Sequence, residues 1–289
     1  MRSKRMLKRL IPLFTILIGA AFVTVGFFMG AKEAYFCNLN LTNIDSVVES
    51  AGIAGIDVNV SIADLEIIAS NDAKDFMISA QNISRNNLRY TVSDHILSLK
   101  YVNDKWYKAA EIPGLMRKDG KIKITVPAGL PIKDIQIKSG IGKSSVKYLT
   151  AENIYINCGL GSSSFESVKA DYIEIENDMG DIFAKDMNAK EIYVSCDAGQ
   201  SDFQNIYSES AVIKNGIGDM TLSGAIEGDS RFESGLGDIN AEIYGCKDDY
   251  SIYAISGDIR INGRKTAQTS GGKYNMDVVG GDISIDFKR

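Results

Sequence analysis

Apolar and polar residues alternate along most of the second half of the chain, and the alternation repeats every nineteen residues. Each repeat is centred on a glycine. Isoleucine or a similar residue stands seven and five positions before it, as Ile154 and Ile156 stand before Gly161. In the later repeats, apolar residues also stand two and four positions after the glycine. Alternation with a period of two is typical of half-buried β-strands.

The glycines that mark the repeat are Gly142, Gly161, Gly180, Gly199, Gly218, Gly237, Gly257 and Gly281. The first six are nineteen residues apart, and the last two follow after twenty and twenty-four. We expect a structural turn at each, with a positive φ angle or a close backbone approach, since glycine tolerates both. Nineteen residues hold two short strands and two connections. The pattern therefore predicts an all-β fold, a parallel β-solenoid whose two-strand rungs stack in chain order over residues 135–289.

Residues 51–134 also contain strand-like segments, but their spacing is irregular. The clearest is 121–127, which ends at Pro127 because proline cannot donate to a β-ladder. A long loop that carries Trp106 precedes it. An open end of a parallel stack would expose unpaired backbone groups. We therefore interpret 51–134 as an irregular β cap on the solenoid.

The amino terminus has the pattern of a membrane anchor. Residues 1–9 form a flank with five basic residues and no acidic one, and residues 10–31 carry no charge. As a helix, this apolar segment would be about 33 Å long, enough for a hydrocarbon core of ~30 Å. A basic flank stays in the cytoplasm. We therefore expect a transmembrane helix at 10–31, a linker at 32–50, and an extracytoplasmic domain after it.

A cleaved signal peptide is the alternative for this segment. The apolar core of such a peptide spans about 7–15 residues and ends at a cleavage site with small residues. The segment here is longer, and Met29-Gly30-Ala31 is a poor cleavage site. We favour an uncleaved signal-anchor in a single-pass protein of the cell membrane, with the lipid bilayer as the partner of residues 10–31.

Charge narrows the range of partners. The chain carries 32 Lys and Arg against 37 Asp and Glu. Because five of the basic residues lie in the flank, the part predicted outside the cytoplasm is the more acidic one. Nucleic acid requires a basic surface, so we expect no nucleic-acid partner.

The cysteines predict free thiols. Cys158 and Cys196 occupy the same repeat position two rungs apart, with Asn177 between them. Stacked rungs place them ~9.6 Å apart, beyond the limit of roughly 7 Å for the Cα atoms of a disulfide. We expect both to be buried and unpaired. Cys37 and Cys246 have no evident partner, and the absence of any Cys/His cluster argues against a zinc site.

An aspartate follows the glycine in several repeats, namely Asp181, Asp219, Asp238, Asp258 and Asp282. Stacked carboxylates repel one another, so the turn must supply a compensating group. Calcium is one candidate, with Asp219, Asp238, Asp258 and Asp282 as its weak candidate ligands. The alternative, which we favour, is that each side chain accepts hydrogen bonds from backbone N–H groups in the turn. We therefore predict no metal site and no cofactor.

No combination of residues predicts catalysis. Aspartates on a parallel β-helix can cleave polysaccharides, but they need two carboxylates whose environments push their pKa values apart. A uniform row on a turn supplies neither. The chain has no Ser/His/Asp set and no phosphate-binding loop, and its one histidine, His95, lies in a strand-like segment of the cap. We expect a protein that is not an enzyme and has no catalytic residues.

Aromatic residues offer a candidate binding face. Tyr155, Tyr193 and Tyr253 fall on the outward phase of their strands, and we expect Phe183 and Tyr244 to add to this face. Exposed aromatic rings stack on sugars or anchor protein partners. The alternative is that these are ordinary scattered surface tyrosines.

Two repeats in particular resemble a known family. Residues 173–182, Ile-Glu-Ile-Glu-Asn-Asp-Met-Gly-Asp-Ile, and residues 212–220, Val-Ile-Lys-Asn-Gly-Ile-Gly-Asp-Met, are similar to the repeats of bacterial putative-adhesin domains, also called toast-rack domains. The resemblance covers the chain from about residue 52 to its end. It implies a β-solenoid in a membrane-anchored, LiaG-like protein of a cell-envelope stress system. It implies no catalytic residue.

These features together predict a membrane-anchored, extracytoplasmic and non-catalytic module for interaction or sensing, in cell-envelope stress or surface organisation. The expected partner is an envelope protein or a glycan. The first alternative is an adhesin that binds a surface glycan or protein, and the second is a polysaccharide-active enzyme.

Overall fold

Strands make up nearly all of the chain whose structure is described. The computed structural model describes residues 41–102, 120–226, 230–245, 250–270, 272 and 274–288. The predicted flank and anchor, most of the linker, Trp106, Cys37 and Cys246 lie outside these residues. Within them, the helical element is one 3₁₀ turn, η2 (Arg85–Asn87), and no helix reaches the length and apolar character that a bilayer crossing requires.

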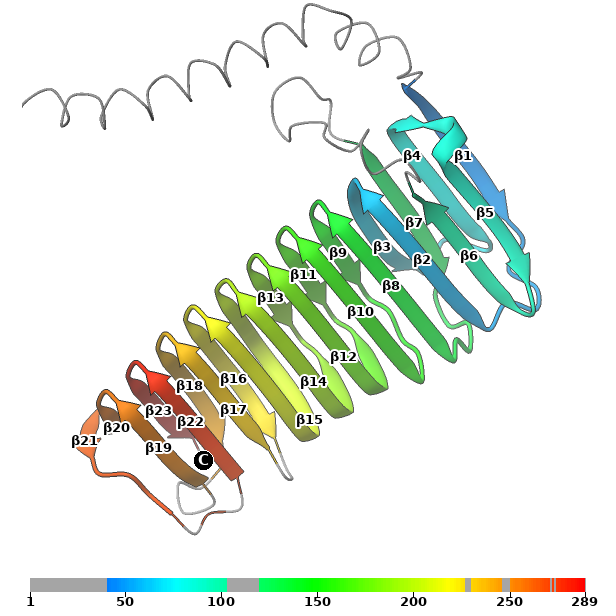
Figure 1. Cartoon of the computed structure of the whole chain (residues 1–289). Coiled ribbons are helices and arrows are strands. Elements are labelled where there is room, and N and C mark those ends of the chain that lie inside the picture. The colour runs from blue at the N-terminus through cyan, green and yellow to red at the C-terminus, as the bar shows by residue number, and fades with distance from the viewer. Residues whose placement is uncertain are drawn as a thin grey trace, which may run out of the picture. The chain divides into compact units, whose positions relative to one another are not determined.

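Hydrogen bonds join the strands into a 23-stranded sheet, which the corners of the rungs fold into two facing layers (Figure 1). Layer A contains, in spatial order, β5 (Leu88–Ser93), β6 (Ile96–Tyr101), β2 (Gly55–Ile62), β8 (Asp134–Ile141), β10 (Asn153–Leu160), β12 (Lys169–Met179), β14 (Asn188–Ala198), the second part of β15 (Ser201–Ile217), β17 (Arg231–Leu236), β22 (Tyr274–Gly280) and β19 (Tyr250–Ser256).

Layer B contains β1 (Leu41–Val48), β4 (Phe76–Ser84), β7 (Lys121–Pro127), β3 (Asp64–Ser70), β9 (Ser144–Lys147), β11 (Ser163–Glu166), β13 (Ile182–Lys185), the first part of β15, β16 (Met220–Ile226), β18 (Ile239–Tyr244), β23 (Ile283–Lys288), β20 (Ile259–Ile261) and β21 (Arg264–Thr266).

The nineteen-residue period is the register of the stack. In layer A, Ile154 pairs in parallel with Ile135 on one side and Ile173 on the other. In layer B, Ser163 pairs with Ser144 and Ile182. Each partner is nineteen residues away, so equivalent positions form straight rows along the stack. The predicted all-β class and the two-strand repeat are confirmed.

The core lies between the two layers. The inward rows of layer A consist largely of isoleucine, and Ile154, Ile173 and Ile175 are fully buried. Layer B contributes Phe165 and Phe203, which are also fully buried. Because polar residues alternate with these positions along each strand, the outer faces remain in contact with water. Burial of apolar surface at about 25 cal/mol per Å² is the main force that holds the layers together.

The carboxyl-terminal rungs do not stack in chain order, and this corrects the sequence-based expectation. Strand β22 pairs with β17 on one side and with β19 on the other, so the last rung lies between two earlier ones. In layer B, β23 lies between β18 and β20 in the same way. The wider spacing before Gly257 and Gly281 accompanies this exchange, because the chain must return past β19 after β20 before β22 begins.

The amino-terminal region is more regular than the expected cap. Strands β2 and β3 form a rung in parallel register with β8 and β9, and Ile56 pairs with Ile135. The chain then leaves the stack and returns with β6 and β7, which pair in parallel with the outer edges of β2 and β3. Here an earlier rung lies between two later ones, which is the reverse of the arrangement at the carboxyl-terminal end. The lone His95 lies in the exposed turn between β5 and β6, with a φ of 65°, and not in a strand.

Antiparallel segments cover the end rungs. At one end, β5 pairs with β6 and β4 pairs with β7. At the other end, β21 pairs with β20, and Thr269 forms a bridge to Ile252 of β19. Exposed strand edges invite pairing with other chains. This arrangement gives each end a covered edge, which is the role expected of a cap.

Candidate functional site

The glycine corners join layer A to layer B on one edge of the stack. Every predicted turn glycine has a positive φ angle; the values are 141° at Gly161 and 135° at Gly180. A Cβ atom on Gly180 would lie 2.2 Å from the carbonyl oxygen of Gly161, and one on Gly161 would lie 2.0 Å from that of Gly142. The corners of successive rungs thus stack too closely for any side chain. This explains the glycine row without any catalytic or ligand-binding role.

The aspartates after these glycines form hydrogen bonds between rungs. The carboxylate Oδ1 of Asp181 accepts from the backbone N–H of Gln200 at 3.0 Å, and that of Asp219 accepts from Asp238 at 2.9 Å. Asp238 accepts in turn from Asp282, and Asp282 accepts from Asp258. Each acceptor therefore serves the equivalent residue of the next rung, and not its own turn as the sequence suggested.

Asp64 belongs to the same row, although the sequence analysis did not include it. Its Oδ1 accepts from the N–H of Lys143 at 2.8 Å. Asp64 was missed because Ala63 stands before it, where the later rungs have glycine. The pair Ala63-Asp64 before the alternating Leu65 and Ile67 was the available signal.

Basic side chains neutralise the last carboxylates of the row. Arg260 donates to Asp282 at 3.0 Å and to Asp258 at 3.3 Å, and Lys265 forms an ion pair with Asp258. The backbone N–H of Asp258, followed by the Arg260 guanidinium, lowers the pKa of Asp282. Among the described residues, no three His, Cys, Asp or Glu side chains gather as a metal-binding group. The carboxylates of the row therefore accept hydrogen bonds from backbone N–H groups and form ion pairs with lysine and arginine side chains.

Small polar side chains close the corners from inside. Three positions before the glycine, Asn177 donates to the carbonyl of Gly180 at 2.8 Å, and Asn215 donates to that of Gly218 at 2.8 Å. Ser234 donates to Gly237 in the same way at 3.2 Å. These side chains are buried, and a buried carbonyl without a donor would be unfavourable. The residues three positions before the glycines form a row of small side chains, and its polar members hold the turns together.

The two cysteines of this row are free and buried, as predicted. Cys158 pairs in register with Asn177, which pairs with Cys196, so one rung separates the two thiols. Burial is the largest cause of the raised pKa of each thiol. Neither is a reactive thiolate in the folded chain.

The second edge of the stack has left-handed corners that the sequence analysis missed. Tyr148, Ser167, Asp186 and Asn205 have φ angles between 53° and 61° and are nineteen residues apart. Because the side chains at these positions differ in type, the sequence contains no residue pattern from which these corners could be predicted. Asn205 donates to the carboxylate of Asp186 across one rung at 2.9 Å. These corners are structural turns as well.

The expected aromatic face is divided between the two layers. Tyr155, Tyr193 and Tyr253 lie on β10, β14 and β19 of layer A, whereas Phe183 and Tyr244 lie on β13 and β18 of layer B. The predicted single face is therefore wrong, because the corner of each rung places the two halves of the repeat on opposite sides.

Within layer A, the tyrosines form no continuous stack. Glu174 stands between Tyr155 and Tyr193 in the register. The ring of Tyr155 instead contacts Tyr172, with 5.6 Å between the ring centroids. Burial and a hydrogen bond to Glu174 raise the pKa of Tyr172 to about 12. These contacts are ordinary packing between neighbouring side chains on a sheet.

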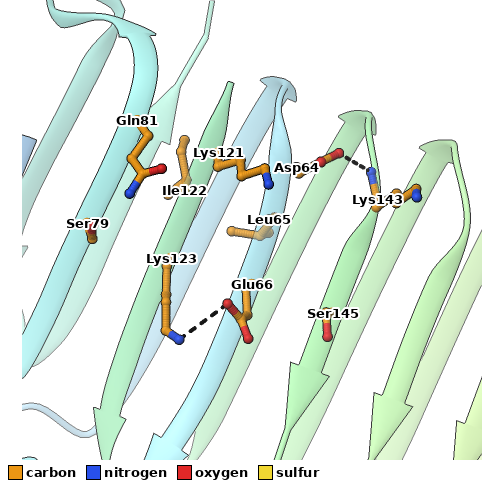
Figure 2. A pocket seen from close by; sticks show the side chains of 10 residues that line it. All are labelled: Asp64, Leu65, Glu66, Ser79, Gln81, Lys121, Ile122, Lys123, Lys143 and Ser145. Carbon is orange, nitrogen blue, oxygen red and sulfur yellow. Dashed lines mark hydrogen bonds and ion pairs between the residues drawn. The ribbon is translucent and has the colours of Figure 1, made fainter. Parts of the chain in front are cut away.

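A surface depression of about 320 Å³ lies on layer B near the amino-terminal end (Figure 2). Strands β3, β4, β7 and β9 line it. Lys123 forms an ion pair with Glu66 at 3.4 Å, and the Lys143 N–H donates to Asp64. The lining side chains are Asp64, Leu65, Glu66, Ser79, Gln81, Lys121, Ile122, Lys123, Lys143 and Ser145. The depression combines hydroxyl, amide, ammonium and carboxylate groups.

A row of apolar side chains runs along the glycine edge, one residue before each glycine from Gly142 to Gly237; Ile141 and Ala198 in this row are half-buried, and the other four are exposed. The exposed fraction is 45% for Leu160, 52% for Met179, 57% for Ile217 and 56% for Leu236. The register pairs Ile141 with Leu160, Leu160 with Met179, Met179 with Ala198, Ala198 with Ile217, and Ile217 with Leu236. We call Ile141, Leu160, Met179, Ala198, Ile217 and Leu236 the corner ridge. It is continuous over six rungs of the stack.

The corner ridge could not be predicted from the alternation of apolar and polar residues. Its residues fall on the same phase of the alternation as the buried positions three, five and seven residues before the glycine. Strict alternation would therefore bury them. The strand turns into the corner at this point, and the side chains face water instead.

Two comparisons agree with this architecture, and a third found nothing. The family model described as Toastrack DUF4097 matches residues 53–289. The fold is similar to that of a putative adhesin from Bacteroides fragilis, with a TM-score of 0.52, 16% sequence identity, and coverage of 86% of this chain and 97% of that chain. A putative adhesin from Parabacteroides distasonis aligns with a TM-score of 0.48 and 10% identity over 85% of this chain and 98% of that one. No curated protein matches the chain. Since the family model covers most of the sequence, the chain belongs to the Toastrack DUF4097 family.

Proposed function

We propose that the chain is a single-pass membrane protein whose β-solenoid lies outside the cytoplasm and binds a component of the cell envelope without catalysing a reaction. The basic flank 1–9 and the uncharged segment 10–31 support the anchor. A role in cell-envelope stress or surface organisation fits a module held near the membrane by the short linker 32–50.

The corner ridge is the observation that carries the binding role. Soluble proteins rarely leave a long row of large apolar side chains in water unless another surface covers it. The stacked carboxylates beside it are engaged with backbone amides. Because these carboxylates join adjacent rungs, we assign them a structural role and not that of the acid and base of glycoside cleavage. Together these features favour recognition by an extended surface.

The topology can be tested with a reporter. Alkaline phosphatase, which is active only outside the cytoplasm, is fused after the last residue of the full chain. We expect activity in intact cells, and a fusion protein that is present at full length but inactive would contradict the proposed orientation. Deletion of residues 10–31 should abolish the activity.

Binding can be tested with the full chain in lipid nanodiscs, presented in parallel to extracted envelope proteins and to a glycan array. We expect retention of a defined component in one of the two experiments. Retention in neither would contradict the binding role. Turnover of cell-wall or plant polysaccharide that the Asp258→Asn variant loses would instead establish an enzyme.

A glycan-binding adhesin is the second candidate. The depression on layer B favours it, because its hydroxyl, amide and charged groups suit a ligand rich in hydroxyls. The described fold is also similar to that of the B. fragilis protein named as a putative adhesin. In this case the glycan array gives the signal, and Lys121→Ala in the depression weakens it while Ile217→Ser on the corner ridge does not.

A further inference from the structure

The corner ridge has exposed aspartates on both sides. Asp181, Asp219 and Asp238 are exposed and follow the ridge residues by two positions across the glycine. On the other side, Asp178 and Asp197 are exposed directly before Met179 and Ala198. The positions after the glycines also include Lys143, Ser162 and Gln200, and glycine occupies the other four positions before the ridge residues. The edge is therefore apolar along its middle, and the charge beside it is mainly acidic, with five aspartates against one lysine over the six rungs.

This combination determines which partners can cover the ridge. A second copy of the chain would bring these aspartates toward one another, and like charges in contact oppose association. An anionic bilayer surface would be repelled in the same way. A partner with an apolar stripe between basic rows would satisfy both features at once.

We propose that the corner ridge binds a basic amphipathic helix of a protein partner. This inference rests on the proposed binding function and specifies the surface and the partner. The ridge extends over about 24 Å at ~4.8 Å per rung, which equals the length of a helix of about 16 residues. The apolar stripe of such a helix lies on the ridge, and its Lys or Arg residues reach the carboxylates on either side.

The carboxylates keep one acceptor for a partner. In Asp181, Asp219 and Asp238, Oδ1 is occupied by the backbone N–H of the next rung. These hydrogen bonds fix the orientation of each side chain before a partner arrives. The partner therefore meets a row of charges that is already ordered, and less entropy is lost on binding.

The test uses a probe of known chemistry with the full chain in phosphatidylcholine nanodiscs. The probe is a labelled 18-residue peptide of leucine and lysine whose leucines fall on one helical face. The control peptide has glutamate in place of lysine, and binding to empty nanodiscs is subtracted. Fluorescence anisotropy at two salt concentrations should show binding of the lysine peptide that weakens with salt, and little binding of the glutamate peptide.

Variants of the exposed side chains locate the site. Ile217→Ser with Leu236→Ser removes part of the ridge and should weaken binding by about tenfold or more, because this apolar area is no longer covered. The matched control is Val47→Ser with Val92→Ser, which removes exposed apolar side chains from β1 and β5. Asp181→Asn with Asp219→Asn removes charge but keeps the amide acceptor, and it should reduce both the affinity and the salt dependence.

Three outcomes would overturn the inference. The first is equal binding of the two peptides, and the second is binding that the ridge variants leave unchanged. The third is a dimer in analytical ultracentrifugation that the ridge variants dissociate, because the ridge would then bind a second copy. If the peptide fails but the nanodisc protein still retains an envelope component, the inference fails and the proposed function stands.

Discussion

The backbone N–H of Asp282 donates to the Oδ1 atom of Asp238 at 2.7 Å, although 44 residues separate the two in the sequence. The residue that follows Asp238 in the sequence repeat is Asp258, and Asp258 instead donates to Asp282. These two hydrogen bonds place the rung of Asp282 between those of Asp238 and Asp258, in agreement with the strand pairing. They also show that the carboxylate row continues through the exchange without a break.

The glycine corners predict a large difference between two glycine substitutions. In Gly180→Ala the new Cβ would meet the Gly161 carbonyl oxygen at 2.2 Å, in a backbone with a φ of 135°. We expect a loss of unfolding free energy of about 1–3 kcal/mol or more, measured by denaturant unfolding. Gly245→Ala is the matched control, since the nearest atom to its Cβ lies at 3.8 Å. Equal stability of the two variants would contradict this account of the corner.

The hydrogen bonds between rungs predict that Asp238→Ala destabilises the stack more than Asp238→Asn. Alanine removes the acceptor for the Asp282 N–H, and loss of one such bond costs about 1 kcal/mol. Asparagine retains an acceptor oxygen at the same place. Thermal unfolding of the two variants beside the parent chain measures the difference. An equal loss for the two variants would show that charge, and not the acceptor, is what the position requires.

The lowered pKa of Asp282 predicts a loss of stability in acid. Its pKa in the folded chain lies below the ordinary value of 3.8, mainly because of the Asp258 N–H and then Arg260. Its stabilising contribution is therefore complete above the unfolded pKa and disappears as the pH falls through the folded pKa. Burial raises the pKa of Asp277, and the sign there is opposite, so stability falls as the pH rises through the folded pKa of Asp277.

Melting temperatures between pH 7 and pH 2.5 separate the two contributions. Asp282→Asn should flatten the decline below pH 4, whereas Asp277→Asn should raise stability at neutral pH relative to acid. If Asp282→Asn leaves the dependence of melting temperature on pH unchanged, the pKa of Asp282 does not contribute to stability and the prediction is wrong.

The carboxylate row predicts that removal of divalent cations leaves stability unchanged. Backbone amides, Arg260 and Lys265 already compensate Asp258 and Asp282. We therefore expect the same melting temperature with calcium and with a chelator. A drop of several degrees in chelator that calcium restores would instead establish a cation on the row formed by Asp219, Asp238, Asp282 and Asp258.

The buried thiols predict slow modification of the folded chain. In a variant with Cys37→Ser and Cys246→Ser, only Cys158 and Cys196 remain. Burial raises the pKa of both, so a thiol reagent should label them only as fast as the stack opens. Addition of denaturant should release both thiols within the mixing time. Rapid labelling without denaturant would contradict their burial.

The repeat could be predicted because every rung needs a glycine at its corner and apolar residues at the same buried positions. A glycine nineteen residues after another glycine predicts the register, since both must stack at one corner. The same reasoning predicted that Cys158 and Cys196 could not pair. Spacing alone cannot predict which rung lies beside which, and the intervals of twenty and twenty-four before Gly257 and Gly281 are compatible with either order.

The candidate site was less predictable, because it depends on what happens at the ends of strands. The alternation that correctly buries Ile154 and Ile156 would also bury Leu160, which is exposed. Aspartate after glycine indicated the carboxylate row, but its donors come from another rung, which local turn chemistry does not show. Tyr155 and Phe183 are both exposed, yet they face opposite sides because a corner lies between their positions in the repeat.

The insertion of β22 and β23 between earlier strands bears on how the molecule is made. A ribosome releases residues 250–261 before residues 274–288, yet β19 and β20 obtain their parallel neighbours only from the later segment. At this end, therefore, the rungs cannot be added to the stack one by one in the order in which they are synthesised. The later segment, β22 and β23, pairs with β17 and β18 on one side and with β19 and β20 on the other. Until this segment is made, the edge at β17 and β18 is open to other chains.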